Sequence, residues 1–166
     1  KMSFEVDFEP VGVSLIHTRL NETGDIFLGY LASDDNPPDP LSYDCMGKIV
    51  TARRDANRKT IDEFTSALGD PFAVSLDIYN HSGETYAISG EHNFPDQKFD
   101  VGHNVAVWVP DECAREDILT HPGLAAQKER ALVMAREAVE LHNQYISGEC
   151  YGIVVQKYTP DGVKLD

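Results

Sequence analysis

Residues 80–103, NHSGETYAISGEHNFPDQKFDVGH, hold the densest group of side chains in the sequence that could do chemistry. Three histidines and four acids fall within this stretch. Imidazole and carboxylate groups bind transition metals and serve as acids and bases in catalysis. The second half contains His92, Asp96, Asp100 and His103 at the spacing H-x3-D-x3-D-x2-H. These residues could form a site, or only the turns between strands.

The spacing argues against a metal ion or any other cofactor. Pro95 and Gly102 exclude a helix, so the four side chains are not aligned on one face. The pattern is also not the D-x-D-x-D-G loop that binds calcium. A turn explains the residues more simply, with Asp100 accepting hydrogen bonds from the following backbone N–H groups and Gly102 supplying a positive φ. The sequence therefore predicts no metal site and no cofactor.

His81 lies in the NHSG turn between two expected strands, where a histidine is typically exposed to solvent. An alternative stays open, in which another element folds over this turn. His81, Asp100, His103 and Gln144 would then line one pocket. Such a pocket would belong to a small enzyme or a ligand-binding domain.

Two further groups could do chemistry. Cys150 follows His142 by eight residues and could pair with it. No sequence signature surrounds that pair, and a free cysteine is commonly a core residue. The segment ARRDANRK (52–59) holds the only clustered cations, Arg53 and Arg54 among them. These cations could bind a phosphate, but internal ion pairs are the simpler expectation.

The charge of the chain is strongly negative, because twenty-eight acids against fourteen bases give −14. Residues 1–45 carry −7 and residues 69–121 carry −8, whereas residues 46–68 carry +2. Direct binding to DNA, RNA or an anionic membrane needs basic residues that displace counterions, so all three are disfavoured. A basic partner is favoured, since a negative field steers positive surfaces toward it. An acidic protein that is merely soluble is the simpler alternative.

The acids that we expect to bind a partner fall in three places. These are an alternating N-terminal segment, the loop at 33–44 and an expected helix start: Glu5, Asp7, Glu9, Asp34, Asp35, Asp39, Asp111, Glu112, Glu116 and Asp117. Side chains on one face of a strand repeat every ~6–7 Å. This repeat resembles the phosphate spacing along a nucleic acid strand.

Hydrophobic periodicity predicts strands at 3–9, 11–20, 25–32, 47–54, 72–79, 84–89, 104–109 and 150–158. A short helix is expected at 60–68, with Thr60 as N-cap and Glu63 completing a capping box. Another short helix is expected after Pro110. A longer helix is expected at about 124–146, with an apolar stripe formed by Leu132, Ala135, Val139, His142 and Ile146.

This order of elements predicts an α+β fold. The sheet would be largely antiparallel, with the helix at about 124–146 packed on one face. A length of 166 residues fits a single domain, 1–166. The loop SDDNPPDPLSYD (33–44) contains three prolines and would be the hinge of an N-terminal β-hairpin at 3–32.

The three cysteines, Cys45, Cys113 and Cys150, are far apart, and no C-x-x-C pair occurs. This pattern predicts free thiols in a reducing cytoplasm rather than a disulfide framework or a zinc knuckle. No apolar run approaches the ~18 residues of a membrane helix. No signal peptide is recognisable at the start. We therefore expect a cytoplasmic protein without membrane contact.

Three motifs in order resemble a family of small acidic proteins from phages, plasmids and conjugative elements. Members carry Y-D-H-S-G, W-D-S-G-Q-V-G and Y-D-Q-Y-L-x-G-x-V-Y-G-Y, and this chain has YNHSG (79–83), FDVGHNV (99–105) and HNQYISGECYG (142–152). Asn80 and Asn143 replace acids of the pattern, which weakens any role of those acids in chemistry, and Phe99 replaces its tryptophan. The resemblance spans residues 47 to 155 or so, and it implies a mobile-element context rather than an activity.

Small acidic proteins of mobile elements often inhibit host defence nucleases. We therefore expect a non-enzymatic protein that acts in the cytoplasm of a bacterial host. It would bind a basic surface of a nucleic-acid-processing or defence complex, of the restriction or CRISPR type, by mimicking the charge of nucleic acid. A purely structural role within the mobile element is a third alternative.

Overall fold

The fold is taken from a computed structural model, which describes residues 6–20, 24–52, 57–95 and 99–165, with backbone alone for 13–20. The chain divides into two compact units. Unit 1 comprises residues 1–37 and 148–166, and unit 2 comprises residues 38–147. Helices and antiparallel sheets are combined in one chain, so the predicted α+β class is confirmed. The chain first passes from unit 1 to unit 2 between Pro37 and Pro38, which lie inside the proline-rich loop.

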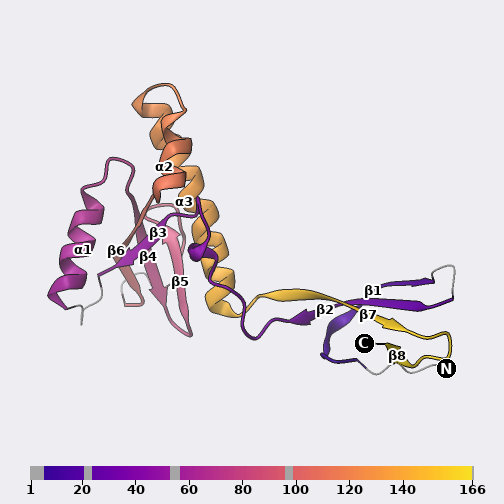
Figure 1. Cartoon of the computed structure of the whole chain (residues 1–166). Coiled ribbons are helices and arrows are strands. Elements are labelled where there is room, and N and C mark those ends of the chain that lie inside the picture. Colours follow the sequence, from indigo (N-terminus) through magenta and orange to yellow (C-terminus); the bar gives the residue numbers. More distant parts are fainter. Residues whose placement is uncertain (1–5, 21–23, 53–56, 96–98, 166) are drawn as a thin grey trace. The chain divides into compact units, whose positions relative to one another are not determined.

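Unit 1 is built around a four-stranded antiparallel sheet (Figure 1). Its strands follow the order β1 (Pro10–Leu20), β2 (Ile26–Ser33), β7 (Tyr151–Tyr158) and β8 (Lys164–Leu165). β2 pairs with β7 along its whole length. Because side chains alternate between faces, every second residue of β2 is buried. These residues form one core with β7, made of Ile26, Leu28, Tyr30, Ala32 and Tyr158.

The predicted strand at 3–9 is wrong over the residues that are described. Residues 6–9 are not in a strand, and β1 begins at Pro10. Asp7 and Glu9 therefore do not repeat along a strand face, so the phosphate-like spacing expected for them is not formed. Glu5 lies outside the described residues.

Unit 2 contains a second antiparallel sheet in the order β3-β6-β4-β5. Its strands are β3 (Lys48–Thr51), β4 (Val74–Asn80), β5 (Glu84–Ile88) and β6 (Val101–Val109). The long helix α3 (Gly123–Ser147) packs against β4 and β5, as Figure 1 shows. The core joins large sheet residues to small helix residues, namely Leu76 and Trp108 with Ala135 and Ala138. The alanines let the helix backbone approach the sheet closely.

The remaining elements of unit 2 are short. They are the 3-10 turn η1 (Pro40–Ser42) and the helices α1 (Arg58–Leu68) and α2 (Glu112–Leu119). α1 begins earlier than predicted, because Asn57 and not Thr60 is its N-cap, and Asn57 Oδ1 accepts the Thr60 N–H at 3.0 Å. Among the described residues, no helix combines the length and apolar character needed to cross a membrane.

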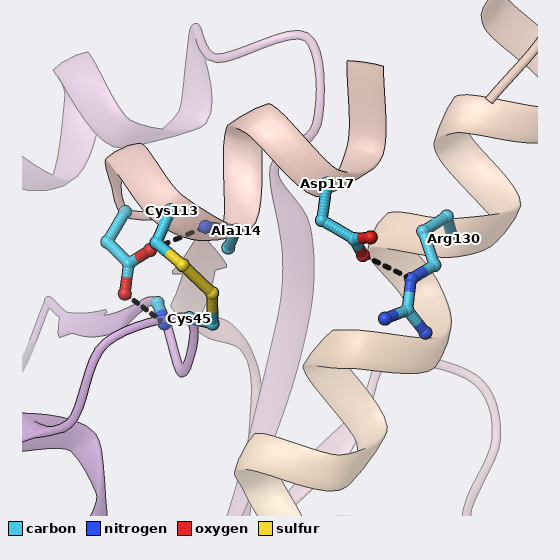
Figure 2. Close-up of a disulfide and its surroundings, with 7 residues drawn as sticks. Cys45, Cys113, Ala114, Asp117 and Arg130 are labelled. Carbon is cyan, nitrogen blue, oxygen red and sulfur yellow. Dashed lines mark hydrogen bonds and ion pairs between the residues drawn. A yellow bond between two sulfur atoms is a disulfide. The ribbon is translucent and has the colours of Figure 1, made fainter. Parts of the chain in front are cut away.

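A disulfide joins two segments of unit 2 and corrects the prediction of free thiols. Cys45, in the loop before β3, is bonded to Cys113 in the first turn of α2 (Figure 2). The neighbouring Asp111 caps α2 by accepting the Ala114 N–H at 2.8 Å, and it also accepts the Gly47 N–H at 2.9 Å. Spacing alone could not reveal this pair, since 68 positions separate the cysteines. The bond removes the cysteine-based argument for a reducing compartment.

Candidate functional site

A buried carboxylate lies at the centre of a polar cluster in unit 2. Asp77 is part of β4 and only 2% exposed. Its Oδ1 accepts the Ser89 hydroxyl at 2.5 Å and the Asn104 N–H at 2.8 Å. Its Oδ2 lies 2.7 Å from His92 Nε2 and 2.8 Å from His103 Nδ1. These four contacts satisfy a charge that would otherwise be costly to bury.

A bulge in β6 brings two of these partners to Asp77. Leu76 pairs with Ala106 and Ile78 with Gly102, so the single residue Asp77 faces three residues of β6, 103–105. Asn104 sits within the bulge at a φ of 53°. The left-handed backbone is uncommon for a residue other than glycine, and bulges and such conformations are frequent beside functional sites.

Gly102 allows this bulge in a different way from the one predicted. The expected positive φ lies at Asn104 and is not found at Gly102. A Cβ at position 102 would instead lie 2.8 Å from Val105 Cγ2. Gly102 is therefore needed for close approach within the bulge rather than for its backbone conformation.

The Asp77 carboxyl is held in its ionised form. Burial raises its pKa, but the hydrogen bonds from Ser89, His92, Asn104 and His103 together outweigh this effect. The pKa consequently lies well below the usual range of an aspartate. The cluster thus presents a fixed negative charge to two imidazole rings at neutral pH.

A series of nearly parallel rings links this cluster to His81. His103 stacks on His92 at 6.2 Å between centroids, and His92 stacks on Phe94 at 4.2 Å. Phe94 stacks on Tyr79 at 5.1 Å, and Tyr79 stacks on His81 at 6.1 Å. Residues from β4, β6 and the segments that follow β4 and β5 therefore form one continuous series of stacked rings.

His81 is exposed, as predicted from its place in the turn after β4. Its Nδ1 lies 3.0 Å from Asp100 Oδ2, so one pair of the hypothesised pocket does meet. His103 contacts Asp77 instead. Gln144 lies on α3 with an exposed side chain, and within the described part of the chain its side chain has no hydrogen bond to either histidine. Asp96 lies outside the described residues.

Asp77 was not among the predicted site residues. Period-two alternation in VSLDIYN places it with Ser75 and Tyr79, opposite the core residues Leu76 and Ile78. An acid at such a position is usually solvated. Here the segment after β5 covers it, because Ser89 and His92 contact it there. The sequence feature that could have indicated Asp77 is a single acid within the mainly apolar strand β4.

The remaining candidate residues are His142, Cys150 and the cations of the basic segment. His142 and Cys150 fall in different units, and Cys150 is a free, partly buried thiol. Arg53 and Arg54 lie outside the described residues. Lys59 is exposed and pairs with Glu63 at 3.7 Å, one turn further along α1, which is the internal pairing expected for the basic segment.

Several of the acids proposed for partner binding have internal partners. Asp7 pairs with Lys164 at 2.5 Å, a bond that lowers the pKa of Asp7, and Asp117 pairs with Arg130 at 2.6 Å. Asp111 caps α2. Asp34 and Asp39 accept the N–H groups of Asn36 and Leu41 at 3.0 and 2.9 Å. The exposed members of the set are Asp7, Glu9, Asp34, Asp35, Asp39, Glu112 and Glu116.

Unit 1 contains a groove between the segment before β1 and the end of β2. Its volume is about 430 Å³, and its lining includes Phe8, Glu9, Ser33 and Asp35. Phe8 is 56% exposed, and both carboxylates are exposed.

Comparison of the chain with protein-family models, with curated proteins and with solved structures finds no match.

Proposed function

We propose that the chain is a non-enzymatic interaction protein, encoded by a mobile element, that binds a basic protein surface. The partner class is a host nucleic-acid-processing or defence complex of the restriction or CRISPR type. The proposed place of action is the cytoplasm of the bacterial host, and the mode is mimicry of nucleic acid charge. The observation that carries the proposal is the acidic groove of unit 1.

The groove combines the features that bind a basic side chain. Glu9 and Asp35 offer two carboxylates for a guanidinium or ammonium group, and Phe8 offers an exposed ring face. The contacts of the two carboxylates with a basic side chain should weaken as salt is added, because both carboxylates are open to solvent. The groove therefore favours a partner that presents arginine or lysine.

An apolar face of the same sheet lies next to the groove. Tyr151, Ile153 and Val155 alternate along β7 and are 52%, 75% and 65% exposed. Ser33 lines the groove and pairs with Tyr151 across the sheet, which joins the two surfaces. An exposed apolar patch beside charged groups is typical of a protein-binding surface.

The proposal can be tested with a panel of bacterial strains that each carry one restriction or CRISPR system. Wild-type chain expressed in these strains should restore plating of a sensitive phage on at least one of them. The double variant Glu9→Lys/Asp35→Lys should lose this effect, because it reverses both groove charges. Asp161→Lys is the matched control, since it reverses an exposed charge of the same unit away from the groove.

Two results would contradict the proposal. One is that no defence system in the panel is inhibited by the wild-type chain. The other is that the double variant inhibits as well as the control, with circular dichroism showing both folded. Binding to the identified complex should also fall between roughly 0.1 and 0.5 M salt, the range over which exposed charges are screened.

A second candidate function is a ligand-binding or catalytic site in unit 2. The observation that favours it is the ring series from His81 to His103, in which Asp100 contacts His81 and Asp77 contacts both His92 and His103. A ligand screen by NMR tests it, with shifts expected around His81 and Asp100. Unchanged spectra across the screen would remove this candidate.

A further inference from the structure

Three side chains of unit 2 offer ligand atoms to a single point. They are Asp77, His92 and His103, and their ligand atoms all lie within 4.8 Å of one another. Atoms bound to one ion at about 2.1 Å stand roughly 3–4 Å apart. The separations of 2.7 and 2.8 Å from Asp77 Oδ2 to the two histidine nitrogens need only a small outward movement to reach that spacing.

The two oxygens of Asp77 have separate roles in this geometry. Oδ1 is held by the Ser89 hydroxyl and the Asn104 N–H, so the plane of the carboxylate is fixed. Oδ2 faces the two histidines. A ligand oriented by neighbouring hydrogen bonds is typical of metal sites in proteins.

The histidines can take the role of ligands. His92 Nε2 and His103 Nδ1 donate to the ionised Asp77 carboxylate, which can only accept, and a bound ion would take the place of these two protons. His92 is 8% exposed and holds one side of the cluster away from water, whereas His103 is 51% exposed. The side next to His103 is therefore open to solvent, so a bound ion would keep a position for water.

We propose that Asp77, His92 and His103 bind one divalent transition metal ion, with zinc as the best fit. Two imidazole nitrogens and one carboxylate oxygen suit zinc and its neighbours in the first transition row. Calcium and magnesium are disfavoured, because they prefer sites made of oxygen ligands. The site belongs to unit 2 and is independent of the acidic groove of unit 1.

The test uses the full chain without a histidine tag, stripped of metal by a chelator. Cobalt(II) is added and its visible absorption followed, and zinc binding is then measured by calorimetry. We expect one equivalent of either ion to bind. His103→Ala should weaken zinc binding by at least about tenfold, because loss of a ligand should cost no less than loss of a residue that only orients one.

His103 is the residue to change first, because it is half exposed and its loss should leave the fold intact. His103→Gln serves as a second variant, and circular dichroism reports folding of both. His81→Ala is the matched control, since it removes an exposed histidine that also contacts an aspartate. The inference is overturned if the wild-type chain binds neither ion, or if the folded His103 variants bind zinc as tightly as His81→Ala. Neither result bears on the phage-plating assay, so this inference and the proposed function can fail separately.

Discussion

His142 shows at the scale of one residue how burial makes stability depend on pH. It lies on α3 with its ring edge-on to Tyr86 at 5.0 Å. Its buried Nδ1 has no hydrogen-bond partner among the described residues. Burial lowers its pKa below the ordinary value of 6.5, although the charges of Asp39 and Glu84 oppose the shift. The folded protein therefore favours the neutral ring.

We predict that stability decreases as the pH falls below about 6.5, because the unfolded chain then binds a proton at His142 that the folded chain resists. The slope from one such group cannot exceed about 1.4 kcal/mol per pH unit. Urea unfolding at pH 7.5 and at pH 5.5 measures it. His142→Leu should have a shallower pH dependence over that range, and an unchanged dependence would contradict the assignment.

Asn143, the next residue, shows why an amide rather than an acid suits its position. Its Oδ1 accepts the Tyr86 N–H at 2.9 Å, and its Nδ2 donates to the Tyr86 carbonyl at 2.9 Å. Tyr86 belongs to β5, an edge strand of its sheet. The amide thus satisfies both polar groups of one residue at an open strand edge. A carboxylate can accept but cannot donate.

We predict that Asn143→Asp lowers the free energy of unfolding by about 1–3 kcal/mol, the cost of leaving the carbonyl unpaired. Gln144→Glu is the matched control, because it makes the same amide-to-acid change on an exposed neighbour and should cost less than about 0.5 kcal/mol. Denaturant unfolding of both variants provides the comparison. Equal midpoints would show that Asn143 does not support β5.

At the scale of elements, the disulfide ties the loop before β3 to α2. Cys113→Ser should lower stability by about 2–4 kcal/mol, because the bond closes a long loop in the unfolded chain. Cys150→Ser removes the free thiol and is the control, with little expected change. Thiol titration of the denatured, unreduced chain should find one free thiol. Three free thiols would show that the bond does not form.

Several elements could be predicted from local sequence, and features made by long-range pairing could not. An apolar, aromatic run predicted β2, and the stripe containing Ala135 and Val139 predicted α3, because each depends only on neighbouring residues. The stripe ends before Ile146, which is 40% exposed. The pairing of β2 with β7 depends on residues far apart in sequence, for which periodicity gives no signal.

The candidate site shows the same difference between features set by neighbouring residues and features set by long-range contacts. The turn carrying His81 was predictable from local composition. The cluster at Asp77 was not, because it needs a bulge in β6 and a covering segment after β5 to meet one residue of β4. Sequence spacing relates His92 and His103 only to residues of their own segment. The third side chain of the proposed metal site, Asp77, lies on a different strand.

At the scale of the whole molecule, the net charge of −14 is not one uniform field. Ion pairs neutralise part of it locally, as at Asp7 and Asp117. Arg136 binds Glu91 through two hydrogen bonds, which lower the pKa of Glu91 and connect α3 to the segment after β5. The acids still free to bind a partner are therefore a smaller set than the composition suggests.

The two units have separate buried clusters, one centred on Leu28 and Tyr30 and one on Leu76 and Trp108. Truncating a buried leucine to alanine typically costs about 2–5 kcal/mol. We predict that Leu28→Ala lowers hydrogen-exchange protection mainly in β2 and β7, and that Leu76→Ala lowers it mainly in β4 and β6. Each variant is the control for the other, because the substitution is the same and only its unit differs. If both variants lost protection equally throughout the chain, the two clusters would behave as one cooperative core rather than two.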